Sequence, residues 1–274
     1  MLESTSHQYL PDTQASVETR NLAVNGAGIS GLKLPLQIVD VDGQTHHTVV
    51  TAEAEVVVAA DERGTHMSRL VEMIDRLGPR CEIAELANAH RQLLARLGSA
   101  AGGFALHFPW FIAKKAPVSG IESWLDIAAT YRVAGERGAG GARVTQALRI
   151  PVTTLCPCSK SISRYGAHNQ RSYVTVMIES SRPIAISPLV SLVEAQASCA
   201  IYALLKRADE KFVTENAYDN PKFAEDLVRD IYQAIQVGHA PISLGVSTEN
   251  QESIHNHAAY AYVGRDPRGL VTVR

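Results

Sequence analysis

The order of strand-like and helix-like segments is the sequence feature that most limits the fold, because the same order occurs twice along the chain. In the first half, two extended apolar segments precede two segments whose apolar side chains recur at the spacing of an amphipathic helix. Two alternating segments follow. The strand-like segments are residues 26–43, 52–60, 104–118 and 123–136, and the helix-like ones are 66–77 and 81–98, with Gly98 at the expected C-terminal cap.

The second half repeats this order from residue 147. Ser187 and Pro188 form a typical helix start before one long apolar-periodic run, and Asn220 and Pro221 start another helix. The last segment is typical of two strands around a turn. The strand-like segments are residues 147–155, 171–180 and 242–265, and the long helical run is 187–207.

These patterns predict an α+β fold of two tandem ββααββ modules, with antiparallel strands in each half and helices on one face. A glycine-rich, polar stretch at residues 135–146 is the expected seam. The predicted division is a polar leader at 1–20, a first module at 21–146 and a second module at 147–274.

Composition limits the partners and the compartment. The chain of 274 residues is 46% hydrophobic and carries a formal charge of −2, so it has a large core and no general basic field. This balance argues against nucleic acid or an acidic membrane as partner. The sequence shows neither a signal peptide nor an apolar run of membrane-spanning length, so we expect a cytoplasmic protein.

Reactive side chains are concentrated in residues 153–174, TTLCPCSKSISRYGAHNQRSYV. The chain has four cysteines, too few for a disulfide framework, and two of them, Cys156 and Cys158, flank a proline here. Thiolate sulfur and imidazole nitrogen are ligands that zinc and related metals prefer, and His168 lies in the same segment. The alternative for the cysteine pair is a tight turn with one buried thiol.

Two further histidines favour the metal interpretation. His255 and His257 lie in a strand-like segment, where alternation would place both side chains on one face. Together with the cysteine pair and His168, they predict a divalent metal site. The glutamates are less informative, since Glu210 and Glu225 are each typical of solvated helix charges, and periodicity places Glu225 off the apolar stripe of its helix.

Three cations near the thiols, Lys160, Arg164 and Arg171, suit a phosphate-bearing substrate, and they equally suit a solvated surface. The sequence contains no Walker loop, GxGxxG, GxSxG or HExxH motif. Nucleotide kinases, Rossmann dehydrogenases, serine hydrolases and gluzincins therefore lack their usual signatures.

Long motifs in these segments resemble the prokaryotic type IB GTP cyclohydrolase I family, which belongs to the tunnelling-fold superfamily. The similar stretches are DERGTHMSRLVE at 61–72, TTLCPCSKSISRYGAHNQRS at 153–172, SCAIYALLKRADEKFVTENAYDNPKFAED at 198–226 and ESIHNHAAYA at 252–261. The resemblance implies a tunnelling fold (T-fold) with two ββααββ modules, whose sheets form β-barrels in a homotetramer with active sites between subunits. It also implies opening of the guanine imidazole ring of GTP, giving 7,8-dihydroneopterin triphosphate and formate, as the first step of tetrahydrofolate biosynthesis.

The resemblance also assigns roles to individual residues. It implies a divalent metal, Zn²⁺, Mn²⁺ or Fe²⁺, whose ligands are Cys156, His168, Glu210 and His255. It places His168 or His257 in proton transfer and Glu225 on the guanine edge, which revises the surface role that periodicity gives Glu225. The side chains expected around the triphosphate are Lys160, Arg164, Arg171, His66 and Arg69.

Two alternatives from other functional classes stay open. One is a tunnelling-fold nitrile reductase, in which a cysteine attacks the substrate covalently and NADPH supplies hydride. The other is a non-catalytic protein in which zinc or a redox-active CxC pair controls stability.

Overall fold

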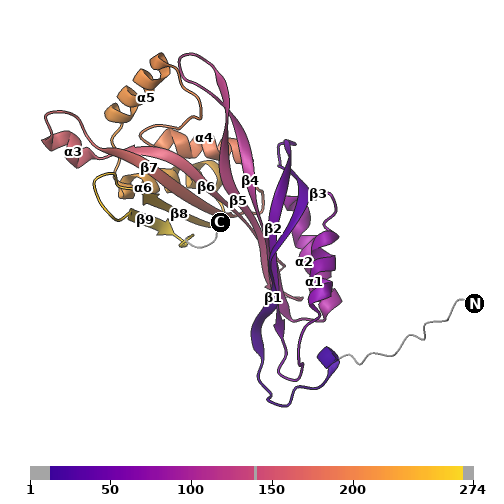
Figure 1. Cartoon of the computed structure of the whole chain (residues 1–274). Helices are drawn as coiled ribbons and strands as arrows, with labels where there is room; N and C mark the ends of the chain where they lie inside the picture. The colour runs from indigo at the N-terminus through magenta and orange to yellow at the C-terminus, as the bar shows by residue number, and fades with distance from the viewer. Residues whose placement is uncertain (1–12, 139–140, 268–274) are drawn as a thin grey trace, which may run out of the picture.

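The computed structural model describes residues 13–138 and 141–267, so residues 1–12 of the predicted leader lie outside the described residues. After a short 3-10 helix, η1 (Thr13–Ala15), the chain enters two long paired strands and then two helices separated by a short strand. Two further long strands follow (Figure 1). These elements are β1 (Val24–Val39), β2 (Thr45–Val58), α1 (Met67–Asp75), β3 (Arg80–Glu82), η2 (Ile83–Glu85), α2 (Leu86–Leu97), β4 (Ala101–Lys115) and β5 (Glu122–Glu136).

The second half begins with a hairpin that contains a short helix, continues through three helices and ends in a second hairpin. Its elements are β6 (Arg143–Leu155), α3 (Pro157–Ile162), β7 (Asn169–Glu179), α4 (Ile186–Gln196), α5 (Arg207–Asp219), α6 (Ala224–His239), β8 (Ser243–Asn250) and β9 (Ala259–Gly264). None of the helices in the described residues is long and apolar enough to cross a membrane.

The described strands form one continuous sheet of nine strands in the order β3-β1-β2-β4-β5-β6-β7-β8-β9. The two halves merge because β5 and β6 pair antiparallel, from Ala128 opposite Arg149 to Ala134 opposite Arg143. The sheet is mixed, since β3 pairs parallel with β1. The expected T-fold of two ββααββ modules with antiparallel sheets is therefore wrong: the chain forms a single mixed sheet, and three helices separate β7 from β8. Residues 146 and 147 lie within β6, and the division of domains there stays a prediction.

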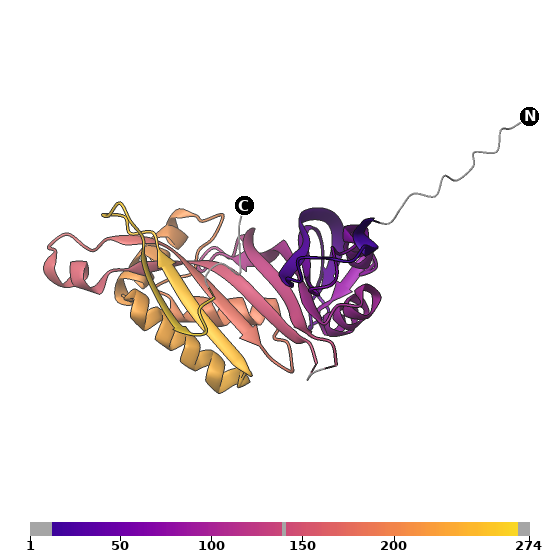
Figure 2. The same cartoon turned by 90° about the horizontal axis from the view of Figure 1, so that it is seen from below.

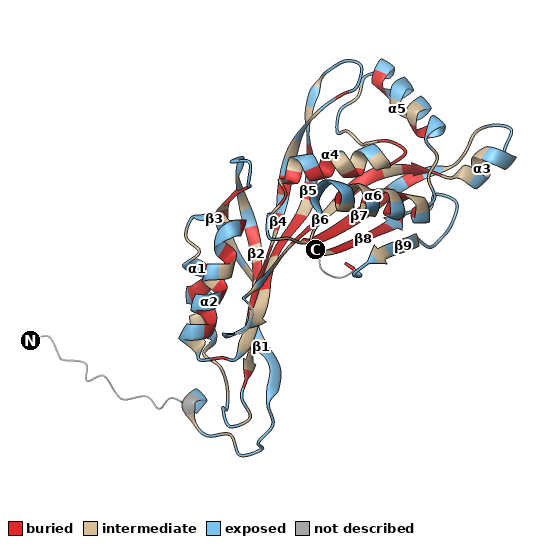
Figure 3. Ribbon diagram, turned by 180° about the vertical axis from the view of Figure 1, so that it is seen from behind, coloured by how far each residue is buried: buried red, intermediate tan, exposed pale blue. Residues whose placement is uncertain are grey.

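One face of the sheet carries the core, and the helices cover it in two groups. The even-numbered residues of β2 from Val50 to Val58 are buried, as a strand with one covered face requires. Helix α1 contacts β1 and β2, and α2 contacts β4, β5 and β6, whereas α4 contacts β6 and α6 contacts β8 and β9 (Figure 3). In α6, Leu227, Ile231 and Ile235 are completely buried, which stabilises the fold by about 2 kcal/mol for each side chain.

The two helix groups cover different parts of the sheet, and both reach β6. Helices α1 and α2 lie at one end of the molecule, and α3 projects from the other end (Figures 1 and 2). Residues from these two ends of one chain therefore do not share a site within that chain.

Most of the elements expected from periodicity are present, and the largest differences lie in the second half. The helical run predicted at residues 187–207 ends at Gln196, because the next residues turn back onto β6. There the Thr153 N–H donates to the carbonyl of Cys199 at 2.9 Å, and the Ser198 N–H donates to the carbonyl of Thr153 at 3.1 Å. Helix α5 then forms separately, and the sequence pattern did not predict it.

Candidate active site

The β6–β7 hairpin opens at its end into the loop 156–168, which contains α3. The strands pair as far as Leu155 and Asn169, and the Cys156 N–H then donates to the carbonyl of His168 at 3.1 Å. This bond closes the base of the loop. Cys156 and His168, twelve positions apart in sequence, thus leave neighbouring strands side by side.

Cys156 is the N-cap residue of α3, and Pro157 occupies the first turn, where a proline is compatible with a helix start. The Ser159 N–H donates to Cys156 Sγ at 3.4 Å, while Ser159 Oγ donates to the Cys156 carbonyl at 3.1 Å. The same hydroxyl accepts a hydrogen bond from the His168 N–H at 3.2 Å. Ser159 therefore fixes the backbone of both Cys156 and His168, and the thiol of Cys156 remains half-buried.

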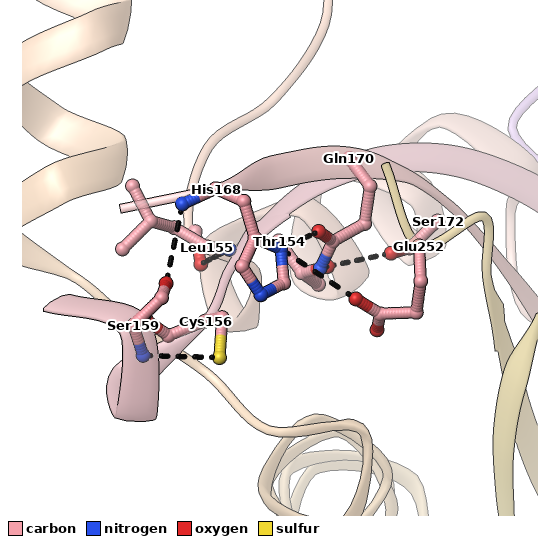
Figure 4. A network of polar contacts seen from close by, with 9 residues as sticks. Thr154, Leu155, Cys156, Ser159, His168, Gln170, Ser172 and Glu252 are labelled. Carbon is pink, nitrogen blue, oxygen red and sulfur yellow. Dashed lines mark hydrogen bonds and ion pairs between the residues drawn. The ribbon is translucent and has the colours of Figure 1, made fainter. Parts of the chain in front are cut away.

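The His168 ring is held through its Nδ1 atom (Figure 4). Nδ1 lies 3.0 Å from Gln170 Oε1 and 3.6 Å from Glu252 Oε2. Gln170 Nε2 donates to Thr154 Oγ1 at 2.8 Å, and Thr154 Oγ1 lies 2.7 Å from Ser172 Oγ. The other ring nitrogen, Nε2, points to the side on which Cys156 Sγ lies (Figure 4).

His255 and His257 lie in the turn between β8 and β9, so the prediction of a strand at these two residues is wrong. Their rings nevertheless lie together, with centroids 5.1 Å apart and planes inclined by 12°. Both residues are exposed. Glu252, which lies in the same turn, reaches the His168 ring.

Cys156 and His168 fit a metal such as zinc, because a sulfur and an imidazole nitrogen face a common side of the loop (Figure 4). In the described part of the chain, however, no group of three His, Cys, Asp or Glu side chains is arranged to hold a metal ion. Glu210 lies in the first turn of α5 and His255 in the β8–β9 turn, both exposed. The structure thus brings together Cys156 and His168, and leaves Glu210 and His255 outside a formed cluster.

Asp209, beside Glu210, connects α5 to the tip of the β4–β5 hairpin. Its completely buried carboxylate accepts hydrogen bonds from the N–H groups of Val118 and Ser119, each at 2.8 Å, from Ser119 Oγ at 2.6 Å and from the Lys206 N–H at 2.9 Å. Burial raises the pKa of Asp209, but these hydrogen bonds from Ser119, Lys206 and Val118 outweigh it and hold the pKa well below its usual range. Asp209 therefore fixes the start of the helix that carries Glu210.

Glu225 lies in the first turn of α6 and is exposed, while Ala224 and Leu227 beside it are buried. This placement agrees with the position off the apolar stripe that periodicity predicted. A carboxylate at a helix N-terminus is favoured by the helix dipole and has both oxygens available to a ligand.

The side chains expected around a triphosphate lie in separate parts of the described chain. Lys160 Nζ donates to the backbone carbonyl of Tyr218 at 2.5 Å and lies 4.3 Å from the centre of the Tyr218 ring. The Arg164 guanidinium lies 5.8 Å from the ring centre of Tyr165, which is exposed at the end of the loop. Arg171 is on β7, on the opposite face from the neighbouring buried residues, and lines a hollow of about 510 Å³.

His66 and Arg69 lie at the start of α1 and line a different hollow of about 320 Å³, next to Asp61 and Glu62. Because α1 and α3 are at opposite ends of the molecule (Figures 1 and 2), these two residues cannot reach Cys156 of the same chain.

Sequence reasoning assigned no role to Gln170, Thr154, Asp209 or Glu252. A signal for two of them was present, since Thr154 and Gln170 are polar residues at strand positions where alternation expects core side chains. Asp209 carried no comparable signal, because most of its partners, the N–H groups of Val118 and Ser119 and the Ser119 hydroxyl, lie about ninety residues earlier in the chain.

The fold is similar to that of uricase, and at the β6–β7 loop it places a half-buried thiol beside an imidazole held through its Nδ1 atom. The uricase from Arthrobacter globiformis matches with a TM-score of 0.50 and 9% identity over 88% of this chain and 93% of that chain. A hyper-thermostable mutant of AgUricase matches with a TM-score of 0.52 and 9% identity over 89% of this chain and 93% of that one. At this identity the likeness concerns the fold alone.

The chain belongs to the type I GTP cyclohydrolase folE2 family, whose model matches residues 10–261. GTP cyclohydrolase FolE2 1 of Dechloromonas aromatica is 48% identical over 92% of this chain and 95% of the relative. GTP cyclohydrolase FolE2 of Paraburkholderia xenovorans is 43% identical over 94% of this chain and 96% of the relative. The expected family is thereby confirmed as type I GTP cyclohydrolase and defined as FolE2, whereas the IB designation is not part of the match.

Proposed function

We propose that this protein is a GTP cyclohydrolase I that opens the guanine imidazole ring of GTP by hydrolysis. The products are 7,8-dihydroneopterin triphosphate and formate, in the first step of tetrahydrofolate biosynthesis. Family membership over nearly the whole chain supports the reaction. The observation that carries it in the structure is the loop 156–168, which holds a half-buried thiol and an oriented imidazole side by side. The IB subtype and a cytoplasmic location remain our predictions.

The proposal includes a divalent metal, Zn²⁺, Mn²⁺ or Fe²⁺. Cys156 Sγ and His168 Nε2 would hold it, with Glu210 and His255 completing the ligands in the assembled enzyme. Bound there, such a metal would supply water of lowered pKa, and thus hydroxide near neutral pH, for attack on the imidazole ring carbon. The mixed sulfur, nitrogen and oxygen donors are compatible with all three metals.

The chain's own residues bind and orient the substrate and move protons. The Glu225 carboxylate accepts two parallel N–H bonds from the guanine edge, and its place in the first turn of α6 leaves both oxygens free to do so. His257 beside His255 is the candidate for proton transfer to the opening ring, since His168 cannot serve as ligand and acid at once. The proposed triphosphate contacts are Lys160, Arg164, Arg171, His66 and Arg69.

We also propose a homo-oligomer, with a homotetramer as the expected form. His66 and Arg69 lie at the start of α1 and Cys156 at the start of α3, and these helices are at opposite ends of the molecule, so a site containing all three needs residues from a second copy (Figure 1). The sheet supports this, because β3 pairs only with residues 37–39 of β1 and leaves most of that sixteen-residue strand as an edge.

The test is to remove metal from the purified protein with a chelator, add back Zn²⁺, Mn²⁺ or Fe²⁺ separately, and measure formate and neopterin formed from GTP. We expect activity to return with at least one metal, and Cys156→Ala to lower it by about 10³-fold or more. Cys158→Ala, two residues away and exposed, is the matched control and should retain most of the activity.

Two results would contradict the proposal. Folded, metal-loaded protein that leaves GTP unchanged would exclude the reaction and return the nitrile reductase to consideration. Unfolding on metal removal, with no turnover under any condition, would indicate a metal-stabilised scaffold.

A further inference from the structure

Polar side chains occupy core positions at the base of the active-site loop. Thr154, Gln170 and Ser172 are 0%, 7% and 0% exposed, on the face of β6 and β7 that also buries Val152 and Val174. A buried polar group is costly unless it is hydrogen-bonded, and apolar residues would stabilise this position more simply. The network therefore needs a reason beyond packing.

The three side chains form a chain of hydrogen bonds that ends at the His168 ring (Figure 4). Ser172 Oγ lies 2.7 Å from Thr154 Oγ1, which accepts a hydrogen bond from Gln170 Nε2 at 2.8 Å. Because its nitrogen donates to Thr154 inside the sheet, the Gln170 amide places its oxygen, Oε1, 3.0 Å from His168 Nδ1.

A second oxygen at the same ring atom decides the direction of that hydrogen bond. Glu252 Oε2 lies 3.6 Å from His168 Nδ1, and its carboxylate accepts but does not donate. If Gln170 were flipped, the Nδ1 lone pair would face this carboxylate, which is electrostatically unfavourable. His168 therefore carries its proton on Nδ1, and its Nε2 lone pair points to the side of Cys156 Sγ (Figure 4).

We propose that Gln170, held by Thr154 and Ser172, is a positioning residue that sets the tautomer and ring orientation of His168 for the cyclohydrolase reaction. This inference rests on the proposed function. A ring protonated at Nε2 could neither bind a metal nor accept a proton at that atom. Removal of a hydrogen-bond partner of this kind typically costs about 10- to 100-fold in metal affinity or activity.

The variants for the test separate the hydrogen bonds from the packing. Gln170→Leu removes both bonds at similar volume, whereas Gln170→Glu keeps an acceptor oxygen for Nδ1. Thr154→Val removes the hydroxyl that holds the amide, and Thr154→Ser keeps it. Each variant is first compared with wild type in melting temperature, and the Thr154 pair serves if Gln170→Leu does not fold.

The first measurement is the ¹⁵N NMR spectrum of the histidine rings in metal-free protein, with His168→Gln used to assign the signal. We expect the Nδ1–H form in wild type, Gln170→Glu and Thr154→Ser, and a mixture of tautomers in Gln170→Leu and Thr154→Val. The second is steady-state turnover of GTP by metal-loaded protein. The kcat should fall by about 10- to 100-fold in the two disrupted variants and recover in the two conservative ones, with KM changed by about twofold or less.

Folded Gln170→Leu and Thr154→Val proteins with the wild-type tautomer and wild-type kcat would overturn the inference. Failure of the proposed function is distinguishable, because wild-type protein would then have no GTP turnover while the NMR measurement would still report the tautomer.

Discussion

Each half of the sheet has a long hairpin, and the two hairpin ends differ in structure: one is short and hydrogen-bonded to another element, and the other is a long, exposed loop. In the first half, β4 and β5 pair up to Lys115 and Glu122, and the short tip between them is tied to the buried carboxylate of Asp209. In the second half, the β6–β7 hairpin opens into a loop of thirteen residues, 156–168, whose outer side chains Ile162 and Tyr165 are 84% and 94% exposed.

The first hairpin end therefore supports another element, whereas the second carries the reactive side chains. The β4–β5 tip has its backbone N–H groups satisfied inside the protein, and it fixes the helix that carries Glu210. At the base of the β6–β7 loop, Ser159 makes hydrogen bonds with Cys156 and with the backbone of His168. The thiol of Cys156 and the ring of His168 remain available to a ligand. Within one chain, the first half therefore contributes to the proposed site mainly by supporting the helix that carries Glu210. Its residues His66 and Arg69 can join the site only from a second copy of the chain.

Mixing two inactive variants tests that last point and has the largest expected effect. Cys156→Ala and Arg69→Ala, each nearly inactive alone, should regain up to about a quarter of wild-type activity after subunit exchange, because that fraction of sites combines two intact halves. GTP turnover of the mixture measures this. Cys156→Ala mixed with His168→Ala is the control, since both changes affect the same loop, and it should show no recovery. Equal behaviour of the two mixtures would contradict a site shared between subunits.

Asp209→Asn tests the supporting hairpin and should lower the melting temperature, because a neutral amide accepts these hydrogen bonds less well. Since the pKa of Asp209 is lowered in the folded protein, its stabilisation is complete above the unfolded carboxyl pKa of about 4 and is lost as pH falls towards the folded value. The difference in melting temperature from wild type should thus be constant near neutral pH and shrink below about pH 4. Glu210→Gln, an exposed neighbour, is the control for stability. A difference independent of pH would contradict the role of the Asp209 charge.

A pair of glycine substitutions gives the smallest effects and compares the two hairpin ends directly. Gly120 and Gly166 have φ of 68° and 119°, where a side chain is strained by about 1 kcal/mol. Gly120→Ala should lower the melting temperature by about 2–4 °C and leave kcat unchanged. Gly166→Ala, two residues from His168, should lower the melting temperature similarly and also lower kcat, by roughly tenfold or less. The reverse pattern would show that the two ends are not specialised as described.

Periodicity predicted the strands of both halves except β3, and helices α1, α2 and α6, because each buries one face against a single layer and thereby fixes the spacing of its apolar residues. The prediction from periodicity failed where the backbone forms hydrogen bonds with a segment distant in sequence. Residues 187–207 have helical spacing throughout, yet Thr153 pairs with Cys199 and ends α4 at Gln196. At His255 and His257 the alternating pattern predicted a strand, but these residues form the turn between β8 and β9.

The sequence by itself determined the family, the periodic elements and the reactive residues Cys156 and His168, because side-chain type and local spacing are properties of the chain alone. Only the tertiary structure decided that the halves share one mixed sheet, since strand pairing between β5 and β6 depends on contacts in space. It also decided which polar residues support the site. Gln170 and Glu252 are eighty-two positions apart, and their common role at one ring nitrogen follows from where β7 and the β8–β9 turn meet.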